Sequence, residues 1–222
     1  MRARWHGNLA KVTLAGEEAT EEHVSEEHKG EKPRGRRQAL VEWVVIIVVA
    51  LVAALLIKTF AIQAFFIPSG SMEPTLKPGD RVLVNKLSYD FHKIHIGDVI
   101  VFRRPPRDTT PGIDDLIKRV VALGGETMYV KNCSIYVNGK LEAQPYLPKG
   151  WQNPYSEYCT TWGQPGMLNL PNPYTVPKGD VFVMGDNRRD SYDSRYWGPL
   201  QDSYIVGRAF VRIWPPGRVG LI

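Results

Sequence analysis

The sequence predicts a mainly β protein, in which one N-terminal transmembrane α-helix precedes a single antiparallel β-domain. Three observations predict this fold class. Nineteen consecutive residues, 39–57, form an apolar run with one charge. The 160 residues after position 62 hold 16 of the 20 glycines and 16 of the 17 prolines, a density that breaks any long helix. Short alternating or β-branched runs of strand length lie between these breakers.

The composition excludes several classes of protein. Of the 222 residues, 43% are hydrophobic and 23% are charged, which excludes a fully disordered chain and a polytopic membrane protein. The net charge is +5, to which segments 1–38, 39–62 and 63–222 contribute +1, 0 and +4. Because no segment concentrates this charge, we expect no nucleic-acid partner.

The N-terminal part divides into a tail and an anchor. Residues 1–38 mix charges of both signs with little apolar surface, so we expect a mostly disordered tail. The run ALVEWVVIIVVALVAALLI then matches the roughly 20 helical residues that cross a bilayer core. A buried core helix is rarely apolar on all sides, and the segment 61–64 makes a poor cleavage site for a removable signal peptide. We therefore interpret residues 39–62 as an uncleaved transmembrane signal-anchor helix.

The charges beside the anchor predict its orientation. Five basic residues lie within the ten positions before Ala39, whereas Lys58 is the only one in the first fifteen after Ile57. Basic residues beside a span stay on the cytoplasmic side. We expect a single-pass protein with a cytoplasmic N-terminus and residues 63–222 outside the cytoplasm.

The exported part reads as one all-β domain without an internal repeat. Asn138-Gly139 separates two of its short runs and is a strong two-residue hairpin signal. Residues 143–175 are rich in proline and aromatic residues and lack clean periodicity, so we expect a long excursion from the sheet there. The predicted strands are Arg81–Asn85, Asp98–Phe102, Leu116–Leu123, Thr127–Val130, Ser134–Val137, Asp180–Met184 and Ile205–Ile213.

The chain has two cysteines, Cys133 and Cys159, which are too few for a disulfide scaffold and too far apart for a CxxC motif. In an oxidising compartment they would close a loop of about 26 residues. The alternative is a pair of small buried apolar side chains. A disulfide between them is thus a possible feature of the exported domain.

The stretch IPSGSMEPTL, residues 67–76, offers a candidate nucleophile. Its two prolines fix the backbone on either side, and Gly70 permits a sharp turn, so Ser71 is presented from a rigid loop. A plain serine-rich turn is the alternative. A histidine base is disfavoured because the G-x-S-x-G elbow is absent, and His92 and His95 lack a third ligand for a metal site.

The stretch DDLIKRVVAL, residues 114–123, offers a candidate base. Side chains alternate along a strand, so Lys118 shares an apolar face with Leu116 and Val120, while Arg119 points the other way. Burial lowers the pKa of a lysine, and a neutral amine acts as a general base near neutral pH. The alternative is a lysine that extends to solvent.

The stretch GDNRRDSYDSRYWG, residues 185–198, directly follows the apolar run VFVM. Loops after a core strand often carry function. Ser191 or Ser194 would be able to hydrogen-bond a buried amine and orient it. An ordinary charged loop is the alternative.

Taken together, these three stretches, in this order after an N-terminal span, resemble the signature boxes of bacterial type I signal peptidases (leader peptidases), a family of Ser-Lys dyad serine proteases. GDRVLVNK and GDVIVF are similar to the strand boxes between them. The resemblance covers residues 63–222 and does not extend to the tail. It implies an antiparallel β-barrel catalytic domain of signal-peptidase type, and a membrane-bound endopeptidase that cuts after a small-x-small motif without metal or cofactor.

The resemblance also assigns roles to residues. It implies that Ser71 is the nucleophile and Lys118 the general base. The backbone N–H of Ser71 and the hydroxyl of Ser69 match the oxyanion hole, and Ser191 matches the serine that orients the lysine. Asp193 and Arg195 match a pair that braces the site. The positions that match the walls of the substrate pockets are Phe65, Ile67, Pro68, Met72 and Ile117, whereas Leu116 departs from an aromatic found in some members.

The expected partners are the signal peptides of secreted preproteins and membrane lipid. We expect a monomer of the bacterial inner membrane that acts near the protein-export translocon, with its catalytic domain on the periplasmic side. The 14 residues from Ile57 to Ser71 span at most about 50 Å, which keeps Ser71 close to the membrane. Two alternatives are a self-cleaving peptidase of the repressor type, which would need a DNA-binding domain, and a catalytically inert β-domain that binds exported chains.

Overall fold

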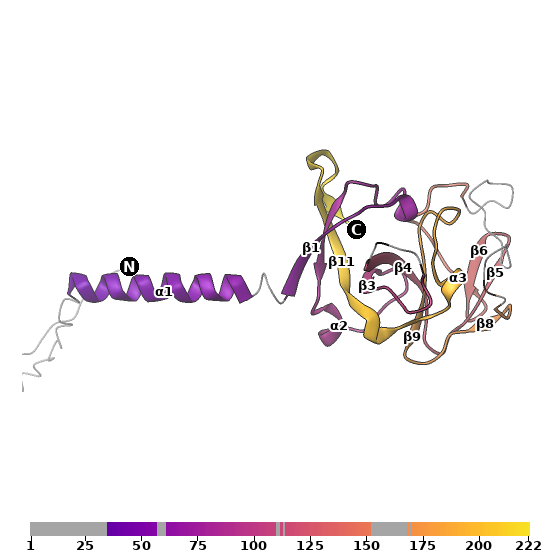
Figure 1. Cartoon of the computed structure of the whole chain (residues 1–222), viewed down its shortest axis with the longest axis horizontal. Coiled ribbons are helices and arrows are strands. Elements are labelled where there is room, and N and C mark those ends of the chain that lie inside the picture. Colours follow the sequence, from indigo (N-terminus) through magenta and orange to yellow (C-terminus); the bar gives the residue numbers. More distant parts are fainter. Residues whose placement is uncertain (1–34, 57–60, 110–111, 113, 152–167, 169) are drawn as a thin grey trace, which may run out of the picture. The chain divides into compact units, whose positions relative to one another are not determined.

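The computed structural model describes residues 35–56, 61–109, 112, 114–151, 168 and 170–222. These residues form one long helix and two antiparallel sheets (Figure 1), so the mainly antiparallel β fold class is confirmed. Most of the predicted tail, residues 1–34, lies outside the described part of the chain.

Helix α1 (Arg36–Leu56) is the apolar segment predicted to span a membrane. An 18-residue window within its residues 36–55 has a mean hydropathy of 2.5, and by length and composition the helix suffices to cross a bilayer. The helix ends six residues before the predicted end of the anchor at Ile62, which instead opens strand β1 (Ile62–Phe66). The sequence is apolar on both sides of Lys58, so composition alone did not separate helix from strand.

The main sheet carries the centre of the domain (Figure 1). All of its pairings are antiparallel, and β12 (Gly220–Leu221) adds to the C-terminal half of β11. Its main path runs in the order β1 (Ile62–Phe66), β2 (Arg81–Asn85), β11 (Ile205–Trp214), β3 (Val99–Arg103), β4 (Asp115–Leu123), β9 (Asp180–Met184) and β10 (Leu200–Gln201).

A smaller sheet lies at the side of the domain away from β1 (Figure 1). Asn138 and Gly139 have φ values of 50° and 78°, the left-handed backbone that a tight two-residue hairpin needs, so the predicted hairpin is present. The strands of this sheet, in order, are β7 (Lys140–Leu141), β6 (Ser134–Val137), β5 (Thr127–Lys131) and β8 (Tyr174–Thr175).

Short helices connect the strands. They are η2 (Gly70–Met72), α2 (Ser88–Phe91), α3 (Ser194–Trp197), η3 (Asp202–Tyr204) and η4 (Pro216–Arg218).

Strand β4 is buried on both faces, and this position decides the state of its lysine. Ile117 belongs to a hydrophobic cluster built with β2 and β3, Val121 to a second cluster beneath the smaller sheet, and Val120 to a third around Trp197. A side chain in the middle of this strand is therefore packed among other side chains on either face. Lys118 is accordingly 4% exposed, which excludes the alternative of a lysine that extends to solvent.

Cys133 is 7% exposed and takes part in a disulfide. Its predicted partner, Cys159, lies outside the described residues. The pairing of these two cysteines stays a prediction.

Candidate active site

Ser71 lies in a loop that closes on itself. The N–H of Ile67 donates to the carbonyl of Asp80, and the N–H of Gly79 donates to the carbonyl of Ile67, both at 2.9 Å. Met72, in the same short helix as Ser71, is fully buried in the hydrophobic core. Because the loop is tied at its base and anchored by this side chain, it holds Ser71, 8% exposed, in one place.

Lys118, on strand β4 of the main sheet, meets Ser71 from below the loop between β1 and β2. The amine Nζ lies 2.7 Å from Ser71 Oγ in a hydrogen bond, and it donates to that oxygen when it is protonated. Burial lowers the pKa of Lys118 from its ordinary value of 10.5 to about 8. Among the nearby charges, Arg195 lowers this pKa further, while the carboxylates of Asp193, Asp108 and Asp186 raise it.

Two donors lie beside the hydroxyl of Ser71. Ser69 Oγ is 3.4 Å from Ser71 Oγ and donates to it. The backbone N–H of Ser71 lies in the single turn of η2, where N–H groups have no partner within the helix. Both donors thus lie within the Ser71 loop, beside the hydroxyl itself.

At Gly185, the stretch of residues 185–198 packs against the loop that carries Ser71. A Cβ added to Gly185 would lie 2.4 Å from the Ser71 carbonyl oxygen and 2.3 Å from Ser191 Oγ, so only glycine fits there. Asn187 fastens the same contact, since its N–H donates to Ser71 O at 3.1 Å and its Nδ2 donates to Gly70 O at 3.2 Å. The sequence offered no signal that this glycine, among 20, needs to lack a side chain.

Asp193 and Arg195 form a buried two-point ion pair. Arg195 Nε and Nη2 donate to the two carboxylate oxygens of Asp193, both at 2.8 Å. Asp193 also accepts the N–H of Gly185 at 3.0 Å, and Arg195 donates to the carbonyls of Arg188 and Ser191. Burial raises and Arg195 lowers the pKa of the Asp193 carboxyl, and the net result is a lowered pKa. This pair thus ties both ends of the loop to the sheet.

Ser191 is next to the site, but its hydroxyl does not bond to Lys118. Its Oγ is buried and has no partner of hydrogen-bond geometry in the described part of the chain, although it lies near enough to Asp193 to contribute to that lowered pKa. Ser194, the other serine considered for orienting the amine, accepts the N–H of Val183 at 3.0 Å and is engaged with strand β9.

A second buried ion pair, which the sequence did not predict, joins strand β4 to the loop after β9. Arg119 Nε and Nη2 donate to the two oxygens of Asp186 at 2.8 and 2.7 Å. Thr75 Oγ1 donates to the same carboxylate at 2.6 Å, and Arg119 Nη1 donates to the carbonyl of Gly97 at 2.7 Å. Strand alternation correctly placed Arg119 on the face opposite Lys118, but no local pattern identified its partner.

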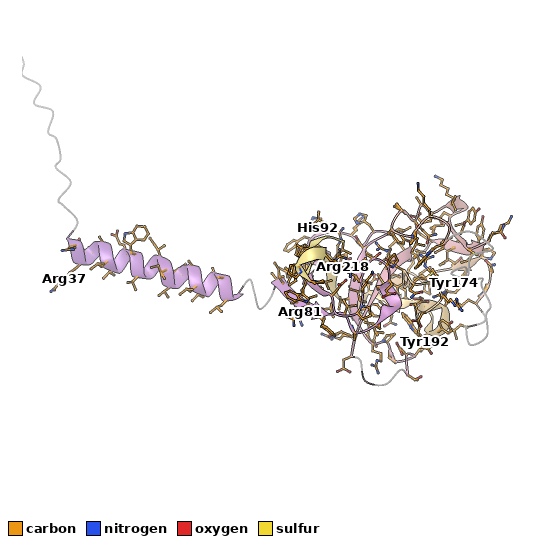
Figure 2. The ribbon with its side chains drawn as sticks, turned by 90° about the horizontal axis from the view of Figure 1, so that it is seen from above. Arg37, Arg81, His92, Tyr174, Tyr192 and Arg218 are labelled. Carbon is orange, nitrogen blue, oxygen red and sulfur yellow. The ribbon has the colours of Figure 1, made fainter. Side chains whose placement is uncertain are left out.

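The dyad opens into a cavity of about 200 Å³. Larger cavities, of about 590, 560 and 400 Å³, lie elsewhere in the domain and touch neither Ser71 nor Lys118, so the chemistry of the lining and not the cavity volume marks the site. Tyr192, labelled in Figure 2, is 42% exposed. The residues that line the site cavity are Ser69, Gly70, Ser71, Asp108, Leu116, Lys118, Asp190 and Tyr192.

The residues expected to line the substrate pockets do not border this cavity. Ile67, Met72 and Ile117 are buried in the core beneath the Ser71 loop, and Phe65 packs against the same cluster. Pro68 is exposed. Asp108, Asp190 and Tyr192 border it instead, and no sequence pattern singled these residues out.

The prediction that this site holds no metal depends in part on the two histidines of residues 63–222. His92 and His95 are exposed. Over the described residues, no group of three or more His, Cys, Asp or Glu side chains is arranged to hold a metal ion.

A serine hydroxyl bonded to a buried amine of lowered pKa defines a class of enzyme, the serine hydrolases that use lysine as the base. The comparisons with known proteins agree with this class. A family model described as "Signal peptidase, peptidase S26" matches residues 40–214. The chain belongs to this signal peptidase family.

Several curated relatives share most of this chain. A probable signal peptidase I-1 of Synechocystis is 41% identical over 164 residues, which cover 72% of this chain and 76% of the relative. A signal peptidase IB of Staphylococcus aureus is 36% identical over 178 residues, 79% of this chain and 90% of the relative. A crystal structure of a signal peptidase I from Enterococcus faecalis V583 is 28% identical, covers 53% of this chain and 97% of its own, and has a TM-score of 0.39.

Family membership confirms the resemblance read from the three sequence stretches. The activity is that of signal peptidase I, a serine endopeptidase that removes signal peptides, and signal peptides of preproteins are its substrates. The alternative of a catalytically inert β-domain is excluded.

Gly185 provides a test of this site geometry. In Gly185→Ala, the added Cβ would displace the Ser71 backbone and Ser191, and a misplacement of about 1 Å costs about 100-fold in rate. We expect such a loss in the rate of preprotein cleavage. Gly217→Ala is the matched control, because a Cβ at Gly217 meets nothing within 4 Å. A Gly185→Ala enzyme as fast as this control would contradict the described geometry.

Proposed function

We propose that this chain removes signal peptides through an acyl-enzyme on Ser71, with Lys118 as general base, and that it cuts after a small-x-small motif. The observation that carries the proposal is the 2.7 Å hydrogen bond between Lys118 Nζ and Ser71 Oγ. Burial of the amine supports it, because a pKa of about 8 leaves a useful fraction of Lys118 neutral near physiological pH.

The neutral amine starts the reaction by accepting the proton of the Ser71 hydroxyl while Oγ attacks the scissile carbonyl carbon. The resulting oxyanion is stabilised by the N–H of Ser71 and the hydroxyl of Ser69. The Lys118 ammonium then gives its proton to the departing amine, which becomes the N-terminus of the mature protein, and the signal peptide remains as an ester on Ser71. Lys118 next takes a proton from water while the water oxygen attacks the ester carbon. The ammonium then gives this proton to Ser71 Oγ as the ester bond breaks, and the signal peptide leaves with a free C-terminal carboxylic acid that ionises in solvent.

The supporting residues receive roles in the same scheme. By the family resemblance we assign Ser191 to orienting the amine, and the support is that its buried Oγ has no hydrogen-bond partner of good geometry among the described residues and so is available for this role. The ion pair of Asp193 and Arg195 braces the loop that carries Ser191.

The substrate preference follows from the space beside Ser71. A cavity of about 200 Å³ favours a small side chain next to the scissile bond. By the family resemblance we assign separate pockets, for the residues before the scissile bond, to Phe65, Ile67, Pro68, Met72 and Ile117, none of which borders this cavity. The support is that three of them, Ile67, Met72 and Ile117, pack together in the core beneath the Ser71 loop.

The membrane is the second proposed partner. We assign residues 1–38 to a cytoplasmic tail, the apolar helix to a single-pass anchor in the bacterial inner membrane, and residues 63–222 to the periplasmic side. Three large apolar side chains of the main sheet, Phe66, Trp214 and Leu221, are 60%, 50% and 87% exposed, which favours contact with lipid. We further expect a monomer that acts near the protein-export translocon, where its substrates emerge.

Substitution of the dyad tests the mechanism directly. Ser71→Ala removes the nucleophile and Lys118→Met removes the base, so each variant should lose at least about 1,000-fold in rate. The assay is incubation of the detergent-solubilised protein with a preprotein, followed by N-terminal sequencing of the product. Ser203→Ala and Lys131→Met, both at exposed positions, are the controls. Full activity in either dyad variant would refute the assignment.

The pH dependence of kcat tests the state of the base. Because the neutral amine is the active form, kcat should rise with pH and level off above the Lys118 pKa of about 8. The same shift affects stability: the unfolded chain binds more protons than the folded one between about 8 and 10.5, so the free energy of unfolding should rise with pH across that range. A kcat that is flat through pH 8 would exclude Lys118 as the titrating base.

Protease protection tests the topology. Protease added to intact spheroplasts should degrade residues 63–222 and leave the N-terminal tail protected, because the basic residues before Ala39 hold that end in the cytoplasm. The measurement is immunodetection of a tag at each end of the chain. Protection of the C-terminal tag with loss of the N-terminal tag would mean the opposite orientation.

A further inference from the structure

Behind the dyad lies a buried group of charges with more guanidinium than carboxylate. Arg119 and Arg188 are 5% and 6% exposed, and Asp186 is fully buried. Both oxygens of Asp186 already accept from Arg119, and one also accepts from Thr75. Arg188 instead donates to neutral acceptors, and its Nε donates to the carbonyl of Gly185 at 3.0 Å.

Tyr146 provides a neutral partner for both guanidinium groups. Arg119 Cζ lies 3.8 Å from the centre of the Tyr146 ring, close enough for a strong cation–π contact. Arg188 Nη2 donates to the Tyr146 hydroxyl at 3.4 Å. Burial raises the pKa of Tyr146, so its hydroxyl stays protonated. One aromatic side chain thus satisfies two cations without adding a negative charge.

The two arginines connect Tyr146 to both members of the dyad. Arg119 directly follows Lys118 on strand β4, so the contacts of its guanidinium help to hold the strand that carries the amine. Arg188 holds the carbonyl of Gly185, and Gly185 lies against the backbone of Ser71. The segment that carries Tyr146 is part of the excursion 143–175, to which the family resemblance assigned no role.

The charge of this partner matters for the base. Burial lowers the pKa of Lys118; of the charged groups that face it, Asp193, Asp108 and Asp186 raise this pKa, and Arg195 lowers it. A further carboxylate behind Arg119 and Arg188 would neutralise them, but it would also favour the charged amine. A tyrosine hydroxyl adds no negative charge, so it does not raise the pKa of Lys118 and the neutral amine stays favoured.

We propose that Tyr146 is a positioning residue for the cleavage reaction: it holds Arg119 and Arg188 together and so fixes strand β4 and the loop after β9 around Lys118 and Ser71. The inference rests on the roles proposed for Ser71 and Lys118. It assigns the start of the excursion to the catalytic machinery, although Tyr146 touches neither the substrate nor the reacting atoms.

Three substitutions in the full-length chain separate the contributions of Tyr146. Tyr146→Phe keeps the ring over Arg119 and loses one long hydrogen bond, so kcat should stay within about 3-fold of the wild type. Tyr146→Leu loses both contacts, and kcat should fall about 30-fold while KM changes by less than about 2-fold. Tyr146→Glu adds a carboxylate, so the rise of kcat should move to higher pH.

Tyr136→Leu is the matched control. Tyr136 stacks on Tyr129 in the smaller sheet, with ring centres 4.7 Å apart, and loses a comparable aromatic contact when substituted. Thermal unfolding of all variants in the same detergent shows whether stability has changed equally. Wild-type kcat in Tyr146→Leu would overturn the proposal, and so would an equal loss of kcat in Tyr136→Leu. An unmoved pH profile in Tyr146→Glu would overturn the need for a neutral partner.

These outcomes are distinct from a failure of the dyad itself. If Ser71→Ala or Lys118→Met remained active, the proposed mechanism would fail whatever Tyr146 does. If Tyr146 proved dispensable, both dyad variants would still be inactive.

Discussion

The burial of the Lys118 amine beside Ser71 is the constraint on which the rest of the structure depends. Lowering the pKa of a lysine from 10.5 to about 8 means that the fold disfavours the charged amine by about 3 kcal/mol. Most water must therefore be excluded from around Nζ, which borders only the small cavity beside Ser71. Strand β4 provides this, because its central residues are buried on both faces and the Ser71 loop closes over the amine.

Because little water surrounds the amine, the charged side chains near it need hydrogen-bond partners within the protein. A buried charge without a partner destabilises a fold by several kcal/mol, so the arginines behind the dyad need acceptors of good geometry. Asp186 and Asp193 each receive two hydrogen bonds from one arginine, and these pairs join β4, the Ser71 loop and the loop after β9. The same contacts that satisfy buried charge thus fix the reacting groups, which links the stability of the domain to its activity.

Much of the fold was predictable because its signals are local. The strands Arg81–Asn85, Ser134–Val137 and Asp180–Met184 have the predicted bounds, since alternation and turn residues define them within a few positions. Strand β1 was missed because its sequence, IQAFF, continues the apolar character of the preceding helix. It is a strand because β2 pairs with it along its whole length, and that pairing is a tertiary contact.

By itself, the sequence determined the family, the apolar helix, most strands and the residue types of a Ser-Lys hydrolase. Tertiary structure decided which side chains meet. Lys118 reaches Ser71 across 47 positions and Arg119 reaches Asp186 across 67, distances that no local pattern encodes. The register of β4 against β9 and the missing side chain of Gly185 set these contacts. Whether an amine is neutral, or a glycine is required, depends on atoms that only the folded chain brings together.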